Sequence, residues 1–356
     1  MFLKRGHRKY FIILIGLVYF FLNYYNFRSV SLEKTTQLET LKTTTQAIAN
    51  LTGTYVVLSI DLDTSLDYQL FYLPIVCLSW RLVNFEPIVI AIISNRTEIN
   101  KLAMKTIEYL DLLRIKIVSI QSVESYEKMI AILSRLFVGL LDEPEIRDDH
   151  FIFQTDCDLL PINKQFYESF DKGESIKIFQ VSSSEKPTEN FIYNDKNYHM
   201  YARNHLGMMK WQWKELMNFD KLTLRLEASS ILQLGKEYYE DSLIKKNDQF
   251  LKGGMSLDMD LYILSINMAD YLKKANHKLS VKISSGIKLN RLWSEEKWRK
   301  TFESKFDSIN EIQLFNENYL DKLNLISLIV NKLFSNEEKK LINTCINEFV
   351  KMKKKN

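Results

Sequence analysis

Two aspartates, Asp156 and Asp158, stand one residue apart directly after a short apolar stretch that begins at Phe151. Residues i and i+2 of an extended segment point to the same side, so both carboxylates can face one cation. Carboxylate oxygens, completed by substrate phosphates, are the usual ligands of Mg²⁺ and Mn²⁺. The pair therefore predicts a site for a hard divalent cation. The competing interpretation is that one aspartate caps the next segment and the other is solvated.

The stretch in front of the pair decides between these interpretations. Residues 151–155 have the nearly continuous apolar character of a buried strand in a parallel sheet. Pro161 ends the extended region, because proline cannot continue a central ladder. Open α/β folds bind their ligands at the carboxyl ends of such strands. This context favours the cation site over the capping role.

Strand-like and helix-like segments alternate through the first half of the chain. We expect strands over residues 55–61, 87–94, 115–120 and 151–155, and helices over 66–82, 98–113 and 125–141. This alternation predicts an α/β fold with a mostly parallel, Rossmann-like sheet flanked by helices. After Pro161 we expect a strand over 176–181, a polar loop over 182–197, helices over 221–234 and 236–246, and a helical C-terminal part.

The segment Phe-Gln-Thr-Asp-Cys-Asp-Leu-Leu-Pro, residues 153–161, resembles the DxD element of GT-A-fold glycosyltransferases. In that family two acidic residues hold a divalent metal on the diphosphate of a nucleotide sugar. The resemblance extends loosely from Tyr55 to Trp293, with one tight motif at Asp156 and Asp158. It implies a GT-A fold and a metal-dependent glycosyltransferase that uses Mn²⁺ or Mg²⁺. The implied donor is a nucleotide-diphosphate sugar, in particular a UDP-sugar, and the implied acceptor is a glycan, glycoprotein or glycolipid.

Three further residues are candidates for the nucleotide-sugar site. Asp61 ends the first expected strand, where the family places groups near the base and ribose; the alternative is a loop carboxylate. Arg135 lies on an otherwise apolar helix face and needs an anionic partner, because burying an unpaired charge is costly. That partner is either Asp156 or a diphosphate. Arg291 lies in a segment that can close over the diphosphate by charge.

Two acids and one histidine follow in the second half. Asp258 and Asp260 begin an expected helix, where acids complement the helix dipole, and this structural role is sufficient to explain them. The resemblance adds that one of them is the general base that deprotonates the acceptor hydroxyl; the sequence does not choose between the two. His277 is the candidate for a third metal ligand that the family supplies, with a surface histidine as the alternative.

The N-terminus predicts a membrane anchor. Basic residues Lys4, Arg5, Arg8 and Lys9 precede a mostly apolar run over residues 10–27, just long enough to span a bilayer. Positive charge before the run places the N-terminus in the cytosol and the rest of the chain in the lumen of the Golgi or the endoplasmic reticulum. We therefore expect a single-pass type II protein; a cleaved signal peptide is the alternative.

These features divide the chain into six expected regions. They are a cytosolic tail (1–9), an anchor (10–27), a stem (28–54), a nucleotide-sugar-binding half (55–161), an acceptor-binding half (162–300) and C-terminal helices (301–356). Sequons at Asn50 and Asn95 agree with a lumenal location. The 48 basic and 44 acidic residues are interleaved, which argues against a nucleic-acid partner. Three cysteines do not form a disulfide framework.

Two other functions remain open. Residues 57–66 resemble the first motif of haloacid-dehalogenase-type phosphohydrolases, with Asp61 as nucleophile and Asp63 as acid/base, and Asp156 and Asp158 would then hold Mg²⁺. Thr64 and Ser65 depart from that motif, and the long segment beyond Asp158 would be unexplained. The other alternative is a non-catalytic, membrane-tethered binding protein of the GT-A fold.

Overall fold

The computed structural model describes residues 53–62, 67–94, 100–123, 126–168, 176–180, 190–201, 205–219, 225–239, 259–274, 279–283, 286–315 and 319–353. The expected anchor, nearly all of the stem, both sequons, Asp63, Asp258 and His277 lie outside these residues. Among the residues described, no helix is both long and apolar enough to cross a membrane.

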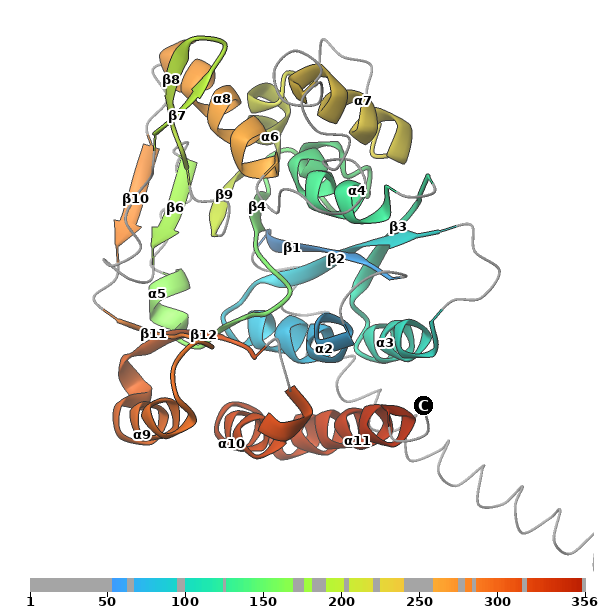
Figure 1. The fold of residues 1–356 in the computed structure, drawn as a ribbon, viewed down its shortest axis with the longest axis vertical. Helices are drawn as coiled ribbons and strands as arrows, with labels where there is room; N and C mark the ends of the chain where they lie inside the picture. The colour runs from blue at the N-terminus through green and yellow to red at the C-terminus, as the bar shows by residue number, and fades with distance from the viewer. Residues whose placement is uncertain are drawn as a thin grey trace, which may run out of the picture. The chain divides into compact units, whose positions relative to one another are not determined.

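A seven-stranded sheet is the centre of the compact unit formed by residues 48–356 (Figure 1). Its strand order is β10-β6-β9-β4-β1-β2-β3. The strands are β1 (Thr54–Asp61), β2 (Glu86–Ile93), β3 (Lys116–Gln121), β4 (Phe151–Gln154), β6 (Ile176–Gln180), β9 (Leu206–Met209) and β10 (Leu279–Ile283). All neighbours pair in parallel except β9, which is antiparallel to both β4 and β6. The expected α/β fold with a mostly parallel sheet is confirmed at this level.

Helices cover both faces of this sheet (Figure 1). One face carries α2 (Asp67–Leu82) and α3 (Lys101–Leu112). The opposite face carries α4 (Glu127–Ser134), the 3-10 helix η1 (Arg135–Leu140), α6 (Lys210–Leu216), α7 (Ala228–Tyr239) and α8 (Met259–Lys274). Alternate residues of β1 serve the two cores, with Val56 in the first and Val57 in the second. The apolar run of β1 is therefore explained by burial on both faces.

A second, three-stranded sheet adjoins the candidate site. It consists of β11 (Ile287–Leu289), β12 (Ile309–Gln313) and β5 (Leu159–Pro161), in the order β11-β12-β5. Because β5 follows β4 after only four residues, the segment with the two aspartates joins the two sheets. The expectation that everything beyond residue 300 is helical is wrong for β12, whose short run of five residues gives little pattern to recognise.

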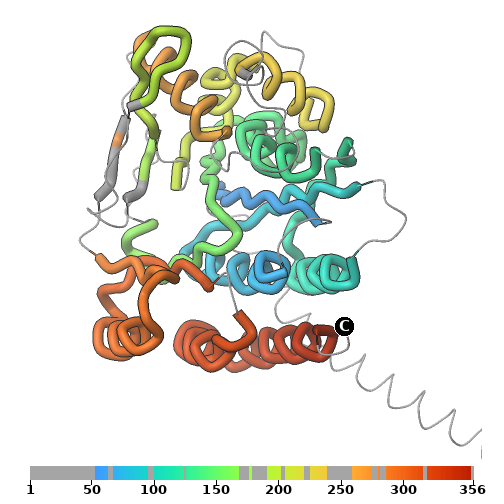
Figure 2. The backbone as a smooth tube through the Cα atoms, viewed as in Figure 1, coloured from blue at the N-terminus to red at the C-terminus, as the bar shows by residue number. Residues whose placement is uncertain are grey.

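The remaining C-terminal elements are helical, as expected. They are α9 (Glu295–Lys305), η4 (Phe306–Ser308), η5 (Tyr319–Lys322), α10 (Leu323–Leu333) and α11 (Asn336–Lys353). Figure 2 shows α10 and α11 running along the outer side of α2 and α3. The rings of Phe71 in α2 and Phe349 in α11 have centroids 5.6 Å apart. The C-terminal helices therefore extend the core on the α2 side of the sheet.

Two expectations for the second half are corrected. The polar loop over 182–197 contains β7 (Asn190–Tyr193) and the start of β8 (Lys196–His199), which form a hairpin. Its turn is made by Asn194 and Asp195, with φ of 46° and 59°, and these residue types tolerate the left-handed region. The helix expected over 221–234 begins at Ala228 in the structure and continues through Gly235 to Tyr239. A single glycine weakens a helix but does not end it.

Candidate functional site

The site lies where β1 and β4 end. The two strands are parallel neighbours with Val57 opposite Gln154, so their carboxyl ends meet at one edge of the sheet. Asp156 and Asp158 follow β4, and the buried Asp61 ends β1. The residue that directly follows β12 holds the backbone of Asp158: Leu314 donates its N–H to the Asp158 carbonyl at 2.9 Å. Both sheets therefore fix the position of the acidic segment.

Arg135 connects two acids that are far apart in the sequence. Its Nη1 lies 2.5 Å from Oδ1 of Asp156, and its Nη2 lies 2.6 Å from Oδ2 of Asp260. The side chains of Arg135 and Asp260 are 7% and 2% exposed. Burial opposes the charged form of Arg135, but the carboxylates of Asp260 and Asp156 outweigh it and raise the pKa of Arg135 above its usual value. The guanidinium is therefore a permanent positive charge at the base of the site.

Asp158 has an arginine partner of its own. Nη1 of Arg291 lies 2.5 Å from Oδ2 of Asp158. Arg291 follows β11 and Asp158 precedes β5, and β12 lies between these two strands. The second sheet therefore brings together residues that are 133 positions apart. Burial, and after it the charge of Asp156, raises the pKa of Asp158 to about 6, although Arg291 lowers it.

Cys157, between the two acids, points away from them into the core. Its Sγ donates to the Ser59 carbonyl at 3.2 Å, and burial raises the pKa of the thiol. Ser59 also binds Ser134 across 2.7 Å between the hydroxyl oxygens, and Arg135 is the residue directly after Ser134. Cys77, Cys157 and Cys345 are buried free thiols. Cys157 thus points into the core as expected, but Cys157 and Asp158 form a turn, closed by the Leu159 N–H on the Asp156 carbonyl at 3.4 Å, and not the extended segment that the sequence predicted.

A second buried cluster of charges, centred on Glu311, has no counterpart in the sequence analysis. The fully buried Glu311 carboxylate pairs with Nε2 of His205 through Oε2 and with Nζ of Lys288, 2.9 Å from Oε1. Tyr167 donates its hydroxyl to the same carboxylate at 3.3 Å. The backbone N–H of His205 donates to the Gln154 carbonyl at 3.1 Å, two residues before Asp156. The one sequence signal was a glutamate between two isoleucines, in the stretch Ile-Asn-Glu-Ile at residues 309–312.

The donor set of the site fits a hard divalent cation. Asp156 and Asp158 are separated by one residue, and the charge of Asp156 contributes to the raised pKa of Asp158. A cation between them would relieve this repulsion, and nucleotide phosphates would complete its coordination. Within the described ranges, no group of three or more His, Cys, Asp and Glu side chains is arranged to hold a metal. Among the described residues, Asp156 and Asp158 are therefore the candidates to hold the metal.

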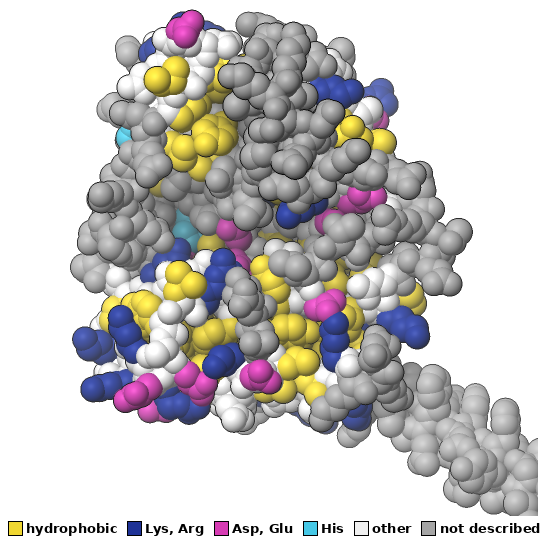
Figure 3. All heavy atoms as spheres, viewed as in Figure 1, with side chains coloured by type: hydrophobic (Ala, Val, Ile, Leu, Met, Phe, Trp, Pro, Cys, Tyr) yellow, Lys and Arg dark blue, Asp and Glu magenta, His cyan; other side chains and the backbone are white. Residues whose placement is uncertain are grey.

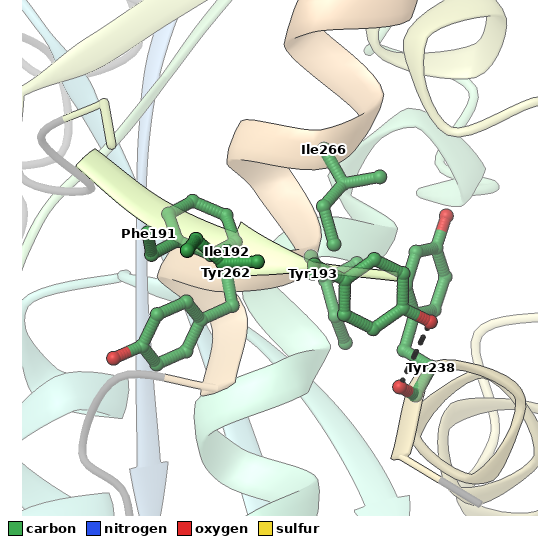
Figure 4. A pocket seen from close by; sticks show the side chains of 7 residues that line it. Phe191, Ile192, Tyr193, Tyr238, Tyr262 and Ile266 are labelled. Carbon is green, nitrogen blue, oxygen red and sulfur yellow. Dashed lines mark hydrogen bonds between the residues drawn. The ribbon is translucent and has the colours of Figure 1, made fainter. Parts of the chain in front are cut away.

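Charged side chains of both signs gather on one face of the molecule. Figure 3 shows acidic and basic side chains together in a hollow near the middle of this face. A separate cavity of about 240 Å³ lies farther along α8 and is lined by Phe191, Ile192, Tyr193, Tyr238, Tyr262, Ile263 and Ile266 (Figure 4). Tyr193 donates its hydroxyl to the Tyr238 carbonyl at 3.1 Å, shown as a dashed line in Figure 4. Helix α8 thus carries Asp260 at one end and part of an aromatic cavity farther on.

Comparison with known proteins gives distant structural similarities. No protein-family model matches the chain, and no curated protein matches it. The galactosyltransferase LgtC, solved with donor and acceptor sugar analogs, is similar with a TM-score of 0.41 and 12% identity, covering 80% of this chain and 99% of that chain. An active-site mutant of LgtC gives the same TM-score and identity over 81% of this chain. The PaToxG glycosyltransferase gives a TM-score of 0.20 and 8% identity over 69% of this chain and 90% of that chain. Similarity at this level is too low to establish a shared fold or activity.

Proposed function

We propose that this chain is a GT-A-type, metal-dependent glycosyltransferase that binds a nucleotide-diphosphate sugar, in particular a UDP-sugar. The observation that carries the proposal is the acidic pair itself. Asp156 and Asp158 follow a buried parallel strand directly, and each is paired with an arginine at the carboxyl edge of the sheet. Carboxylates for a cation and guanidinium groups for phosphate are the two kinds of ligand that a metal–diphosphate requires.

Each residue has a proposed role. Asp156 and Asp158 hold Mn²⁺ or Mg²⁺, which supplies Lewis-acid stabilisation of the departing diphosphate when bound. Arg135 and Arg291 place positive charge where negative charge develops on that leaving group. Asp61, at the end of the neighbouring strand, is the candidate contact for the nucleoside.

Asp260 and Asp258 have different proposed roles. Asp260 is 2% exposed and bound to Arg135, which supports a positioning role for it. A general base must reach the acceptor hydroxyl. Asp258, which lies outside the described residues, is therefore the proposed base, and His277, also outside them, remains the proposed third metal ligand.

The acceptor and the location are proposed from the sequence. The acceptor is a glycan, glycoprotein or glycolipid. An anchor over residues 10–27 would place the catalytic part in the lumen of the Golgi or the endoplasmic reticulum. Protease protection of the full-length protein in microsomes tests this topology, and digestion of the catalytic part in sealed vesicles would contradict it.

The proposed function is tested by replacing both acids, Asp156→Asn with Asp158→Asn, in the full-length protein. We expect UDP release from the accepted UDP-sugar in Mn²⁺ to fall about 100-fold or more, because the metal and its charge on the leaving group are lost. The matched control is Asp111→Asn with Asp270→Asn, two exposed aspartates. Circular dichroism verifies that both double mutants are folded. Full activity in the Asp156/Asp158 double mutant would refute the proposal.

A further inference from the structure

The two acids proposed to hold the metal are already bound to the two arginines proposed to hold the diphosphate. Asp156 and Asp158 accept from Arg135 and Arg291 across 2.5 Å in each case. Their side chains are 26% and 11% exposed, so the pairs are partly shielded from water. In this structure the residues proposed to bind the metal are therefore ion-paired with the residues proposed to bind the phosphates.

A divalent cation alone meets an obstacle at this site. It needs carboxylate lone pairs, and one oxygen of each acid, Oδ1 of Asp156 and Oδ2 of Asp158, now faces a guanidinium group. Binding would either break these ion pairs or place a double positive charge beside two arginines. Both are costly where the dielectric constant is lower than in water.

A diphosphate alone meets the opposite obstacle. The cluster has two arginines and three aspartates, Asp156, Asp158 and Asp260, so its formal charge is +2 − 3 = −1. An anion approaching it is repelled overall, because the positive charges are already compensated. Within this cluster of five described residues, each charged side chain is already paired with one of opposite charge.

Both ligands together remove both obstacles. The cation binds the carboxylates and the phosphates bind the arginines. Each charged side chain then replaces one partner of opposite charge with another. Building on the proposed function, we propose that the paired arginines act as an interlock that makes the binding of a divalent cation and of a nucleoside diphosphate mutually dependent. Linkage requires that each ligand strengthens the other by the same factor.

The two arginines have different parts in the interlock. Arg135 stays fixed when Asp156 is released, because the buried Asp260 holds its other nitrogen at 2.6 Å. Arg291 is 24% exposed and lies beyond the end of β11, so it is the arginine free to turn from Asp158 toward the phosphates. Removing Arg291 should therefore raise the affinity of the acids for the metal and at the same time lower the affinity of the site for phosphate.

Binding measurements on the full-length protein and its Arg291→Met variant test the interlock. Mn²⁺ alone is titrated by electron paramagnetic resonance of the free ion, and UDP is titrated by calorimetry at saturating Mn²⁺. In the variant we expect Mn²⁺ alone to bind about 5-fold or more tightly, and UDP with Mn²⁺ to bind about 10-fold or more weakly. These opposite shifts do not arise from the Mn²⁺–UDP complex that forms in solution, since the variant does not alter it. Arg299→Met, an exposed arginine of α9 that pairs with glutamates, is the control and should shift neither affinity.

The outcomes separate the interlock from the proposed function. If both affinities fall in the Arg291→Met variant, or the affinity for Mn²⁺ alone is unchanged, the interlock is refuted while metal-dependent nucleotide binding stands. If the unmodified protein binds UDP equally well with and without Mn²⁺, the interlock is refuted together with the metal dependence of the proposed function. If it binds neither UDP nor GDP under any condition, the proposed function itself fails and the interlock fails with it.

Discussion

At the scale of single residues, Arg135 organises the candidate site. An arginine on an apolar helix face predicts an acidic partner, and Asp156 was one of the partners expected. The structure adds Asp260, which contacts the guanidinium from a helix 125 positions later in the chain. Asp260 thus links the first turn of α8 to the acidic pair at the end of β4.

Replacing Asp260 with Asn should lower the stability of the fold. Arg135 would keep Asp156 but lose the carboxylate that compensates its buried charge on the other side. We expect the free energy of unfolding to fall by about 1.5–3 kcal/mol, the size of a hydrogen bond to a charged group, because the neutral amide of Asn does not compensate the buried guanidinium. Urea unfolding measures it. Asp270→Asn on the exposed part of the same helix is the control, and an equal change in both variants would contradict the buried role.

The sequence identified the residues of the acidic site better than those of the Glu311 cluster. Asp156, Asp158, Arg135 and Arg291 were named from residue type and context, and Asp260 from the family resemblance. The structure places them together, although their roles stay predictions. Glu311 was missed because its partner His205 is 106 positions away. Neither residue has a local motif, and only the pairing of strands brings them into contact.

At the scale of elements, the pairing of β4 with β9 holds the start of the acidic segment. Gly207 of β9 lies opposite Phe153 of β4, and the rings of Phe151 and Phe153 cover it. A Cβ atom at position 207 would lie 2.7 Å from Cδ2 of Phe153, closer than real side chains approach. Glycine is therefore required at position 207, because the rings of β4, the strand before Asp156, pack closely against it.

Gly207→Ala should consequently destabilise the protein. We expect a loss of about 1–3 kcal/mol, the usual cost of overpacking, because neither phenyl ring can move without disturbing the core. Thermal and urea unfolding measure it. Gly235→Ala in α7 is the matched control: its new Cβ would meet only the end of the Leu133 side chain at 3.0 Å, and it should be neutral or slightly stabilising. Equal stability of the Gly207→Ala protein would show that the strands can separate at little cost.

Longer elements were predicted well and shorter ones poorly. The expected strand over 55–61 matches β1 to within one residue, and the helices around α2 and α3 were recognised from their apolar patterns. The missed strands β9, β10 and β11 have only three to five residues, too few for a period-2 pattern to differ from chance. Their pairing partners, far apart in the sequence, determine them instead.

At the scale of the whole molecule, Glu311 joins the two sheets behind the site. It lies in β12 of the small sheet, while His205 immediately precedes β9 of the large sheet. Burial alone would raise the pKa of Glu311, but the charges of His205 and Lys288 outweigh it and lower the pKa to about 2, from an ordinary 4.5. The ionised carboxylate is therefore favoured in the folded chain.

The ionised Glu311 carboxylate predicts that the free energy of unfolding decreases in acid. Since the folded pKa is the lower one, the contribution of Glu311 is complete above pH 4.5 and is lost as the pH falls toward 2. The loss should be about 3 kcal/mol in the free energy of unfolding. Urea unfolding as a function of pH measures it. Glu311→Gln should flatten the dependence in this window, whereas Glu303→Gln, at an exposed position, should not; the same pH slope in all three proteins would contradict the assignment.

Isothermal titration calorimetry of the full-length protein with UDP, GDP and their sugars, with and without Mn²⁺, tests the proposed site most directly. We expect one diphosphate nucleotide and its sugar to bind only when Mn²⁺ is present, and this binding to disappear when Asp156 and Asp158 are replaced by Asn. Binding without subsequent transfer would indicate the non-catalytic alternative. No nucleotide binding, together with release of phosphate from a simple monoester in Mg²⁺, would contradict the account and assign the chemistry to Asp61 and Asp63.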